Sequence, residues 1–495
     1  MKRDFGPLSF RGAYVRGRFV PPTEGDRFLS EDPGDAARPV GEARGSTLLV
    51  ADAVAAARSA APAWREESLA QRIAILRRYQ KKLAGHGDRL AWVMSRETGK
   101  PLQESRDEVA AMVAKVDLTV TRGLPLVADR RAPLDGGSRS VLRYRPRGVV
   151  GVIGPFNVPG HLPNGQIVPA LLTGNTVVFK PSEFTPFVGQ VLAELFDEAG
   201  FPPGVFNLVQ GGGEVGAALA AEPGVNALFF TGSAATGEKV RALSDRCPDR
   251  LLALELGGKN AALILPDAPW EAALGQVVHG AFATAGQRCS STSRLFVHKK
   301  IARRFIRDLM ARAAALTVGY FTESPGLGPL IDGRAVQRFE AAQESAEKRG
   351  FATLKRGVPA PQSRSGHYVA PSVHLWEGFP SRLLIGPRDY WDEELFAPDL
   401  AVYVLDGEDE MIALNNASRY GLVASVFTAS RPAFERIRER LDNGVVHWNR
   451  STAMTPGVLP FGGTKASGNG WPAGLFVPFA CTVPVGSVET PARRP

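Results

Sequence analysis

The chain has 495 residues, of which 44% are hydrophobic and 22% are charged, and its formal net charge is +9. This length exceeds what one ordinary hydrophobic core accommodates, so we expect two or three domains. Lys and Arg form no dense basic runs, which argues against nucleic acid as a partner and favours a basic but mixed surface. The alternative is that the positive charge attracts an anionic substrate or cofactor.

The cysteines Cys247, Cys289 and Cys481 show no paired spacing of a disulfide framework or a zinc site. We therefore expect no metal, and a reducing compartment fits. Residues 1–7 lack the apolar core of a signal peptide. No run reaches about 18 apolar residues, so we expect no membrane-spanning helix and no membrane partner. These features predict a cytoplasmic protein.

The first 45 residues are rich in Pro, Gly and charge, which predicts an extended arm with one or two short strands. Residues 47–122 are predicted to be mostly helical, because apolar residues recur at helical spacing after Ser68, a candidate N-cap. Residues 126–147 carry many Arg and Asp, which indicates a hairpin or an exposed arm. The tail from residue 472 onward is apolar and typical of a strand.

Short apolar runs alternate with helical stretches from residue 148 onward. A helix is predicted over 185–199, ending at Gly200. This alternation is typical of a parallel, doubly wound α/β sheet, which binds ligands at the carboxyl ends of its strands. A second alternating region, over about 260–445, predicts a second α/β domain. The expected strands are 149–153, 176–179, 205–209, 227–230, 251–256, 261–265, 295–298, 400–405 and 422–428.

Cys289 is the candidate nucleophile, in the segment Gly286-Gln287-Arg288-Cys289. The thiolate is the reactive form, and a free thiol with a pKa near roughly 8.5 is mostly protonated at neutral pH. Arg288 is a nearby cation that would favour the thiolate, and Gly286 permits close backbone approach. The plainer interpretation is a buried, inert cysteine.

Glu255 and Asn157 are the candidate base and oxyanion donor. Glu255 ends an apolar strand just before two glycines, and apolar surroundings raise a carboxyl pKa toward that of a general base. A salt bridge to Lys259 is the structural alternative. Asn157 follows a strand between two prolines, so its amide is a good oxyanion donor, although a turn asparagine is commoner.

Two further loops suit a dinucleotide. Lys180 and Glu183 follow a strand, where they would bind ribose hydroxyls, and Glu183 would repel a 2′-phosphate, which favours NAD over NADP. Residues 230–237 follow another strand and open a helix, a placement that suits a pyrophosphate. Residues 211–216 also match the G-x-G-x-x-G pattern. No acidic ribose partner follows about 20 residues on, so we interpret them as a wall of the same site.

The ordered set of segments resembles the aldehyde dehydrogenase superfamily over nearly the whole chain. Three stretches not yet mentioned also carry the resemblance: Glu97-Thr98-Gly99-Lys100, Glu393-Glu394-Leu395-Phe396 and Pro460-Phe461-Gly462-Gly463. The resemblance implies that Cys289 is the nucleophile, Glu255 the general base and Asn157 the oxyanion donor. It further implies an NAD site lined by Lys180, Glu183, Gly213, Gly232, Ser233, Gly237, Glu394 and Phe396.

The resemblance also implies three structural parts: a Rossmann-type cofactor domain, an α/β catalytic domain and a small bridging sheet that supports a homodimer or homotetramer. The cofactor domain is predicted over 1–125 and 148–256. The catalytic domain is predicted over 257–445, and the bridging sheet over 126–147 and 472–495.

A narrower resemblance is to the N-succinylglutamate 5-semialdehyde dehydrogenases of arginine breakdown, carried by residues 159–165, 282–289 and 467–469. His161 lies in the first of these and is interpreted as a loop histidine that packs under the site. The alternatives left open are a general or other semialdehyde dehydrogenase, a coenzyme A-acylating relative, a cofactor-free cysteine hydrolase and a non-catalytic binding protein. Glu255 favours hydrolysis over acyl transfer to a thiol.

Overall fold

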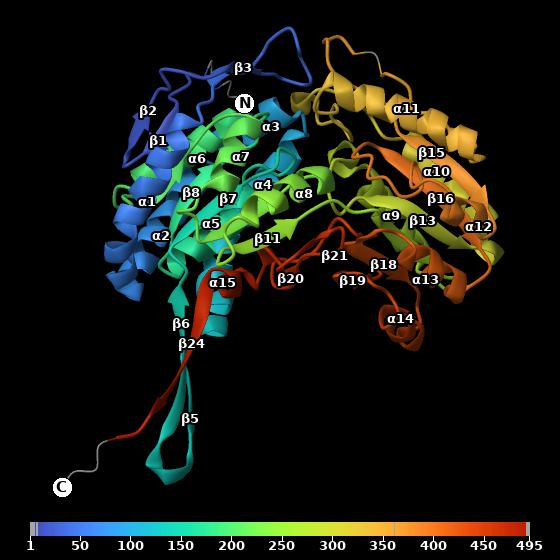
Figure 1. Ribbon diagram of the computed structural model, residues 1–495. Helices are drawn as coiled ribbons and strands as arrows, with labels where there is room; N and C mark the ends of the chain where they lie inside the picture. Colours follow the sequence, from blue (N-terminus) through green and yellow to red (C-terminus); the bar gives the residue numbers. More distant parts are fainter. Residues whose placement is uncertain (1–4, 6–7, 361, 492–495) are drawn as a thin grey trace.

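The computed structural model describes residue 5, residues 8–360 and residues 362–491. Two large sheets lie side by side, each with helices on its faces, and a narrow arm projects from the first (Figure 1). This is the α/β architecture predicted from the alternating pattern. The domain boundaries proposed from the sequence remain a prediction.

The first sheet is parallel through its five central strands and antiparallel at both edges. Its central strands are buried along their length because helices cover both faces. In spatial order its strands are β2 (Arg18–Val20), β1 (Ala13–Val15), β9 (Phe206–Leu208), β8 (Thr176–Lys180), β7 (Val149–Ile153), β10 (Ala227–Thr231), β11 (Leu251–Glu255) and β22 (Gly468–Asn469).

The second sheet has the same character, with one antiparallel strand at its edge. The sequence pattern did not predict β14, β15 and β19, since their apolar runs are short and partly exposed. In order its strands are β14 (Ala352–Lys355), β15 (Ser372–Glu377), β16 (Asp399–Leu405), β13 (Thr292–His298), β12 (Asn260–Ile264), β18 (Val423–Phe427) and β19 (Val445–Trp448).

The helices bury an apolar stripe against the sheets. Ser68 caps α2 by accepting a hydrogen bond from the Gln71 amide, and Gly200 follows α6 in the left-handed conformation, as predicted for both. No described helix is long and apolar enough to cross a membrane. The helices are α1 (Leu48–Glu66), α2 (Leu69–Gly85), α3 (Gly87–Thr98), α4 (Leu102–Leu118), α5 (His161–Leu172), α6 (Pro186–Glu198), α7 (Gly213–Ala221), α8 (Ala234–Ser244), α9 (Trp270–Phe282), α10 (Lys299–Ala314), α11 (Gly333–Arg349), α12 (Ser381–Ile385), α13 (Glu408–Asn416), α14 (Arg431–Arg438) and α15 (Val477–Ala480).

The N-terminal segment is not the extended arm that its composition predicted. Its first two strands, β1 and β2, join the edge of the first sheet, where Tyr14 pairs with Leu208. Two more strands, β3 (Arg27–Ser30) and β4 (Gly41–Arg44), form a separate hairpin. Tyr14 is buried and its hydroxyl donates to Asp197, so this segment is part of the packed body. Residues 1–4 and 6–7 lie outside the described chain.

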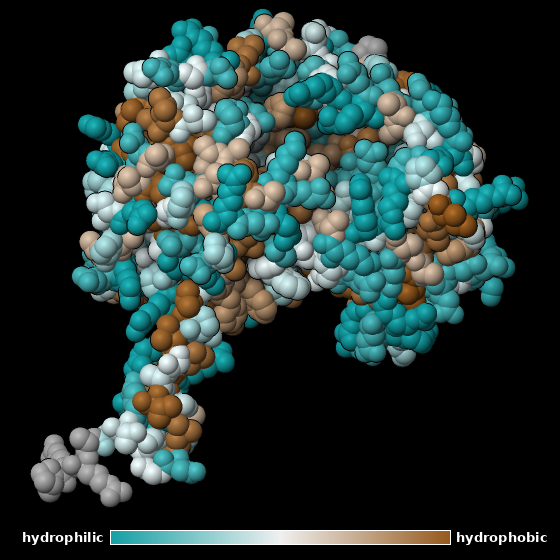
Figure 2. Space-filling model, in the orientation of Figure 1, coloured by the Kyte–Doolittle hydropathy of each residue, from teal (hydrophilic) through white to brown (hydrophobic). Residues whose placement is uncertain are grey.

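The projecting arm is a three-stranded antiparallel sheet built from β5 (Arg130–Pro133), β6 (Arg139–Pro146) and β24 (Thr482–Glu489) (Figure 1). The hairpin predicted over 126–147 is confirmed. The apolar tail is only partly a strand, since α15 covers Val477–Ala480 before β24 begins. Apolar side chains remain exposed along the arm, among them Leu134 and Val488 (Figure 2).

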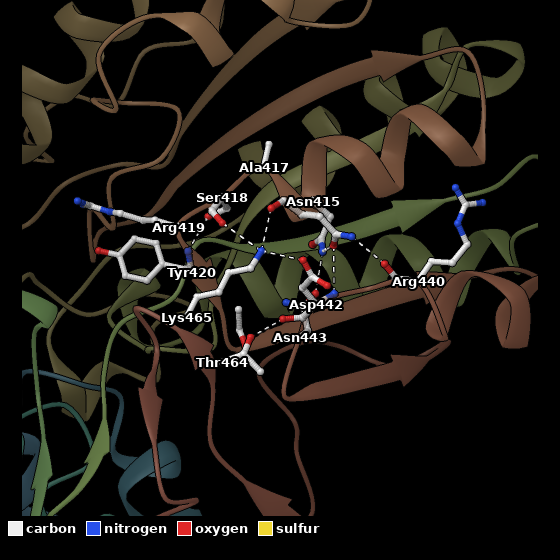
Figure 3. A network of polar contacts seen from close by, with 12 residues as sticks. Asn415, Ala417, Ser418, Arg419, Tyr420, Arg440, Asp442, Asn443, Thr464 and Lys465 are labelled. Atoms are coloured by element: carbon white, nitrogen blue, oxygen red, sulfur yellow. Dashed lines mark hydrogen bonds and ion pairs between the residues drawn. The ribbon is translucent and has the colours of Figure 1, made fainter.

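Lys465 links the segment that carries β22, residues 464–469, to loops next to the second sheet. Its ammonium donates to the Asn416 and Ser418 carbonyls at 2.8 and 3.4 Å and lies 3.0 Å from Asp442 Oδ2 (Figure 3). Lys465 belongs to β21 (Thr464–Lys465), which pairs with β17 (Tyr420–Gly421). The nearby strands β20 (Pro460–Phe461) and β23 (Ala473–Gly474) pair with each other. The network therefore ties β21 to the residues that follow α13 and precede β19.

Lys465→Met should lower the free energy of unfolding by about 1–2 kcal/mol, because two helix-end carbonyls and Asp442 lose a charged donor. Urea denaturation followed by circular dichroism measures the change. Lys299→Met is the matched control, since that side chain is largely exposed and pairs only with exposed Asp406; its change should stay within about 0.5 kcal/mol. Equal losses in both variants would contradict the assigned role of Lys465.

Candidate functional site

A cavity of about 710 Å³ opens between the two sheets. Its walls come from the segments after β7, β8, β10 and β11, from the loop before β13, from α11 and from the segment before β16. The carboxyl ends of neighbouring parallel strands lie at one edge of a sheet, so the loops after them meet there. Cys289, Glu255 and Asn157 all line this cavity, together with every predicted cofactor residue except Gly237.

Cys289 follows a turn whose backbone is unusual. Thr284 and Ala285 have φ values of 55° and 53°, and Gly286 has 69°, so three consecutive residues are left-handed. Such conformations are costly for side chains with a Cβ, and they persist only where surrounding contacts hold them. A Cβ on Gly286 would lie 2.1 Å from the Ala397 carbonyl oxygen, so this position also requires glycine.

Glu104, in the first turn of α4, holds this turn. One carboxylate oxygen accepts from the Thr284 amide at 3.1 Å, and the other accepts from the Thr284 hydroxyl and, at 3.1 Å, from Arg288 Nη2. Arg288 also donates to the Thr284 hydroxyl at 2.8 Å. The expectation that Arg288 activates Cys289 is therefore wrong, because its guanidinium is committed to Glu104 and the strained turn.

Glu255 ends β11 and is 1% exposed. Neither carboxylate oxygen has a hydrogen-bond partner of good geometry among the described residues. Burial raises the pKa of Glu255 to about 8, while the neighbouring Cys289 thiol acts to lower it. The alternative of a salt bridge to Lys259 fails, since that ammonium donates to the Tyr390 and Glu393 carbonyls. Glu255 is thus a buried carboxyl aimed at the thiol.

The Cys289 thiol is not a preformed thiolate. Burial raises its pKa well above the usual range, and the Glu255 carboxylate beside it raises the pKa further. The Glu394 carboxylate also raises the pKa of the thiol. The resting thiol is therefore neutral at pH 7.

The link between β11 and β12 passes through a tight space. A Cβ on Gly257 would lie 2.0 Å from a Glu394 carboxylate oxygen, and one on Gly258 would lie 2.6 Å from the Cys289 carbonyl oxygen. The Gly258 amide donates to Glu394 at 3.0 Å. Asn260 then donates to the Cys289 carbonyl at 2.7 Å. The two glycines let Glu255, Glu394 and Cys289 meet.

Asn157 lies on the loop after β7 and donates through Nδ2 to the Gln287 carbonyl at 2.9 Å, so its amide faces the nucleophile loop. The buried pair Lys100 and Glu108 holds the backbone of this loop. Lys100 donates to the Asn157 carbonyl at 3.2 Å, and Glu108 accepts from the amides of Gly160 and His161. The amide of Asn157 is therefore held in place by its backbone as well as by its side chain.

The far end of the cavity carries groups suited to an elongated ligand with hydroxyls and phosphates. Lys180 Nζ lies 3.3 Å from Glu183 Oε2 at the end of β8. Ser233 caps α8 and accepts from the Thr236 amide at 3.2 Å. A Cβ on Gly213 would meet no atom within 4 Å, so open space borders this glycine. This end has a cation, hydroxyls and a helix N-terminus around a void.

Two predicted residues behave differently from the rest. Gly237 does not line the cavity; a Cβ there would lie 2.6 Å from the Leu256 side chain, so α8 needs glycine to pack on the sheet. Phe396 lines the cavity with φ of 57° and makes an edge contact with Phe156. Sequence reasoning missed Arg338, which reaches the cavity from α11, because that helix carries no motif.

Among the described residues, no group of three or more His, Cys, Asp and Glu side chains is arranged to hold a metal ion. The residues present support covalent and acid–base chemistry: a thiol, a carboxyl that exchanges protons near neutral pH, and an amide beside them.

Comparison with known proteins gives one family. The model of the aldehyde dehydrogenase family matches residues 19–477. The N-succinylglutamate 5-semialdehyde dehydrogenase 2 of Caulobacter vibrioides is 42% identical over 97% of this chain and 96% of its own. The corresponding enzyme of Ectopseudomonas mendocina is 39% identical over 97% and 96%. The solved NAD-dependent aldehyde dehydrogenase from Sinorhizobium meliloti is 30% identical, with a TM-score of 0.91 over 98% of this chain and 96% of that one.

Glu104→Gln should lower the steady-state rate of the enzyme roughly 10- to 100-fold, because small displacements of a reacting group cost that much. The glutamine side chain has one acceptor oxygen, so it cannot accept hydrogen bonds from both the Thr284 backbone N–H and the Arg288 guanidinium as the two carboxylate oxygens do. The rate is measured with saturating substrates. Asp107→Asn is the control and should leave the rate within twofold, because this exposed carboxylate on the same helix pairs, among the described residues, only with Gln103. An unchanged rate in Glu104→Gln would refute the role of Glu104 in holding the turn before Cys289.

The alkylation rate of Cys289 by iodoacetamide should rise with pH and reach half its maximum above the roughly 8.5 of a free thiol. Burial and Glu255 both raise the thiol pKa, so less thiolate is present at neutral pH. In Glu255→Gln the neighbouring negative charge is removed, and the curve should move to lower pH. Mass spectrometry of the Cys289 peptide separates this reaction from that of Cys247. A wild-type midpoint below pH 8 would contradict this account.

Proposed function

The chain belongs to the aldehyde dehydrogenase family, and we propose that it oxidises N-succinylglutamate 5-semialdehyde to N-succinylglutamate with NAD as the oxidant. The observation that carries the chemistry is the buried Glu255 carboxyl beside the Cys289 thiol in a cavity large enough for a dinucleotide. The substrate rests on relatives of that name that are 38–42% identical over 94–97% of this chain.

The cavity residues fit NAD. Lys180 and Glu183 are positioned to bind the adenosine ribose, and Ser233 opens α8 toward the cavity, where a pyrophosphate gains from the helix N-terminus. Open space beside Gly213 leaves room for the cofactor. Glu394 accepts from the Gly258 amide and lies beside the nucleophile, where it would bind the second ribose. The negative charge of the Glu183 carboxylate, which pairs with Lys180, disfavours the 2′-phosphate of NADP.

Oxidation begins when the Cys289 thiol gives its proton to Glu255 and the sulfur attacks the aldehyde carbon. Asn157 uses one N–H on the Gln287 carbonyl, and its second N–H is left for the developing oxyanion. NAD held by Lys180, Glu183, Ser233 and Glu394 would supply the acceptor for the hydride of this carbon. The carbon becomes the acyl group of a thioester on Cys289.

Hydrolysis then releases the acid. Glu255 returns its first proton to solvent, and its carboxylate takes a proton from the water that attacks the thioester carbon. The carbon–sulfur bond breaks, the carboxylate leaves, and Cys289 regains a proton. A pKa of about 8 suits Glu255 to both steps, because the group exchanges protons close to neutral pH.

The other readings have less support. A cysteine hydrolase needs a histidine beside the thiol, and no histidine is among the described residues that line the cavity. A coenzyme A-acylating enzyme would have no use for the buried base. A non-catalytic protein would not need Cys289, Glu255 and Asn157 together on one cavity. A general or other semialdehyde dehydrogenase remains the nearest alternative and differs only in substrate.

We also infer that the protein is a cytoplasmic homodimer or homotetramer that binds neither membranes nor nucleic acid. Its three cysteines are free, which suits a reducing compartment. The arm supports assembly, since a thin sheet with exposed Leu134, Val483 and Val488 buries little surface in a single chain.

The decisive test is NAD reduction by the purified protein with N-succinylglutamate 5-semialdehyde and, separately, with propanal. We expect kcat/KM to favour the first at least 100-fold, because its carboxylates and amide can make hydrogen bonds with the protein that propanal cannot make. Cys289→Ser should bind NAD but reduce none, which ties the signal to the thiol. Similar values for both aldehydes would reduce the proposal to a general aldehyde dehydrogenase, and no NADH from any aldehyde would refute it.

A further inference from the structure

Lys115 is a buried ammonium on α4 with an incomplete set of partners. The residue is 5% exposed, and its Nζ donates to one acceptor, the Gly474 carbonyl at 2.7 Å. No carboxylate of the described chain lies within ion-pair distance of it. An ammonium has three N–H donors, so two of them have no partner in the described protein.

The other buried lysines are satisfied. Lys100 and Lys180 each pair with a carboxylate. Lys259 donates to two carbonyls and lies in the field of Asp399. The pKa of Lys115 is lowered by burial to about 8, and only the Cys481 thiol opposes this shift. Buried charges are normally paired, so Lys115 differs from the other buried lysines in having a vacant position for an anion.

The stem of the Lys115 side chain lies against a glycine of α5. Gly165, in the middle of α5, is buried, yet a Cβ there would meet only Lys115 Cε, at 3.9 Å. Glycine in a helix interior costs roughly 0.5–1 kcal/mol relative to alanine, and here close packing does not require it. The missing side chain instead leaves room on the face that Lys115 borders.

His161 extends the same face. It lies four residues before Gly165 on α5, so the two positions are neighbours on the helix surface. Its Nδ1 is buried and has no hydrogen-bond partner among the described residues. The pKa of His161 is lowered by burial to about 4, and Lys115 contributes to that shift. A neutral imidazole with a free ring nitrogen therefore sits near the unpaired ammonium.

Two chain neighbours of these residues lie near the nucleophile. Leu162, next to His161, lines the cavity together with Cys289. On the other side, Gly474 pairs with Pro460, and the following Phe461 packs with Cys289 in one apolar cluster. The start of α5 and the β20–β23 pair, which flank Lys115, thus both include residues near the Cys289 thiol.

We propose that Lys115 and His161, beside the space left by Gly165, bind a carboxylate of the aldehyde substrate that lies away from its carbonyl. The inference rests on the proposed function, and it names the group that selects the substrate. N-succinylglutamate 5-semialdehyde carries two carboxylates, and propanal carries none. An ammonium and an imidazole N–H give such a carboxylate a charge-assisted and a neutral hydrogen bond.

Lys115→Met removes the charge and keeps the length of the side chain. Its kcat/KM for N-succinylglutamate 5-semialdehyde should fall roughly 30- to 1000-fold, as expected when one partner of a buried charge pair is truncated. The loss should appear mainly in KM, while propanal is oxidised within about threefold of wild type. Lys81→Met, an exposed lysine on α2, is the control and should change neither substrate.

Gly165→Leu provides an independent variant, because it adds bulk beside the Lys115 stem and leaves the charge in place. It should keep the melting temperature within a few degrees and raise KM for the carboxylated aldehyde only. Equal losses with both aldehydes in Lys115→Met and Gly165→Leu would overturn the inference, as would an unchanged KM for the carboxylated one. If wild type oxidises propanal but not N-succinylglutamate 5-semialdehyde, the proposed substrate fails alone. Succinate semialdehyde against propanal then tests Lys115 by the same criteria.

Discussion

The site depends on one constraint: the chain must pass from the first sheet to the second in four residues. Glu255 ends β11 and Asn260 begins β12, and the link between them crosses under both Glu394 and the Cys289 backbone. Any side chain at Gly257 or Gly258 would push these groups apart. Because the link is so short, the base on one sheet and the nucleophile on the other are held at a nearly fixed separation, and the cavity forms where the sheets meet.

Burial shifts the pKa values of the ionisable groups that this short link brings together. Glu255, Glu394 and Cys289 would all be negative if ionised, and burial raises the pKa of each of them. Lys180 and Lys115 are buried cations whose pKa values are lowered for the same reason. The cavity keeps the ion pair of Lys180 and Glu183 at one end, and contacts between a charged ligand and buried groups count for more than they would in water.

The parts that sequence could predict are those encoded locally. Strands such as β7, β8 and β10 follow from short apolar runs, and Lys180 and Ser233 could be placed because loops after parallel strands share one edge. The pairing of Glu255 with Cys289 came from family resemblance, since no spacing relates two residues on different sheets. Glu104 was missed for a related reason: it lies 180 residues from Thr284 in the chain and has no motif.

Local pattern also misled in identifiable ways. Arg288 is next to Cys289 in the sequence, but adjacent residues in an irregular turn point in different directions, and its guanidinium reaches Glu104 instead. Gly237 fitted a phosphate-binding pattern, yet it serves helix packing against Leu256. The N-terminal segment looked like a free arm because its strands are three or four residues long, and only pairing with β9 and burial of Tyr14 define them.

The neutral resting thiol has a consequence for survival under oxidative stress. Hydrogen peroxide attacks thiolates, and each oxidation beyond the sulfenic acid is in practice irreversible for an ordinary enzyme. By keeping Cys289 protonated against Glu255 until an aldehyde arrives, the idle enzyme presents peroxide with a poor target. During turnover the sulfur is bonded to the substrate carbon and is not a free thiolate, so bound aldehyde would shield it further, and an enzyme pool supplied with substrate would be lost more slowly than an idle one.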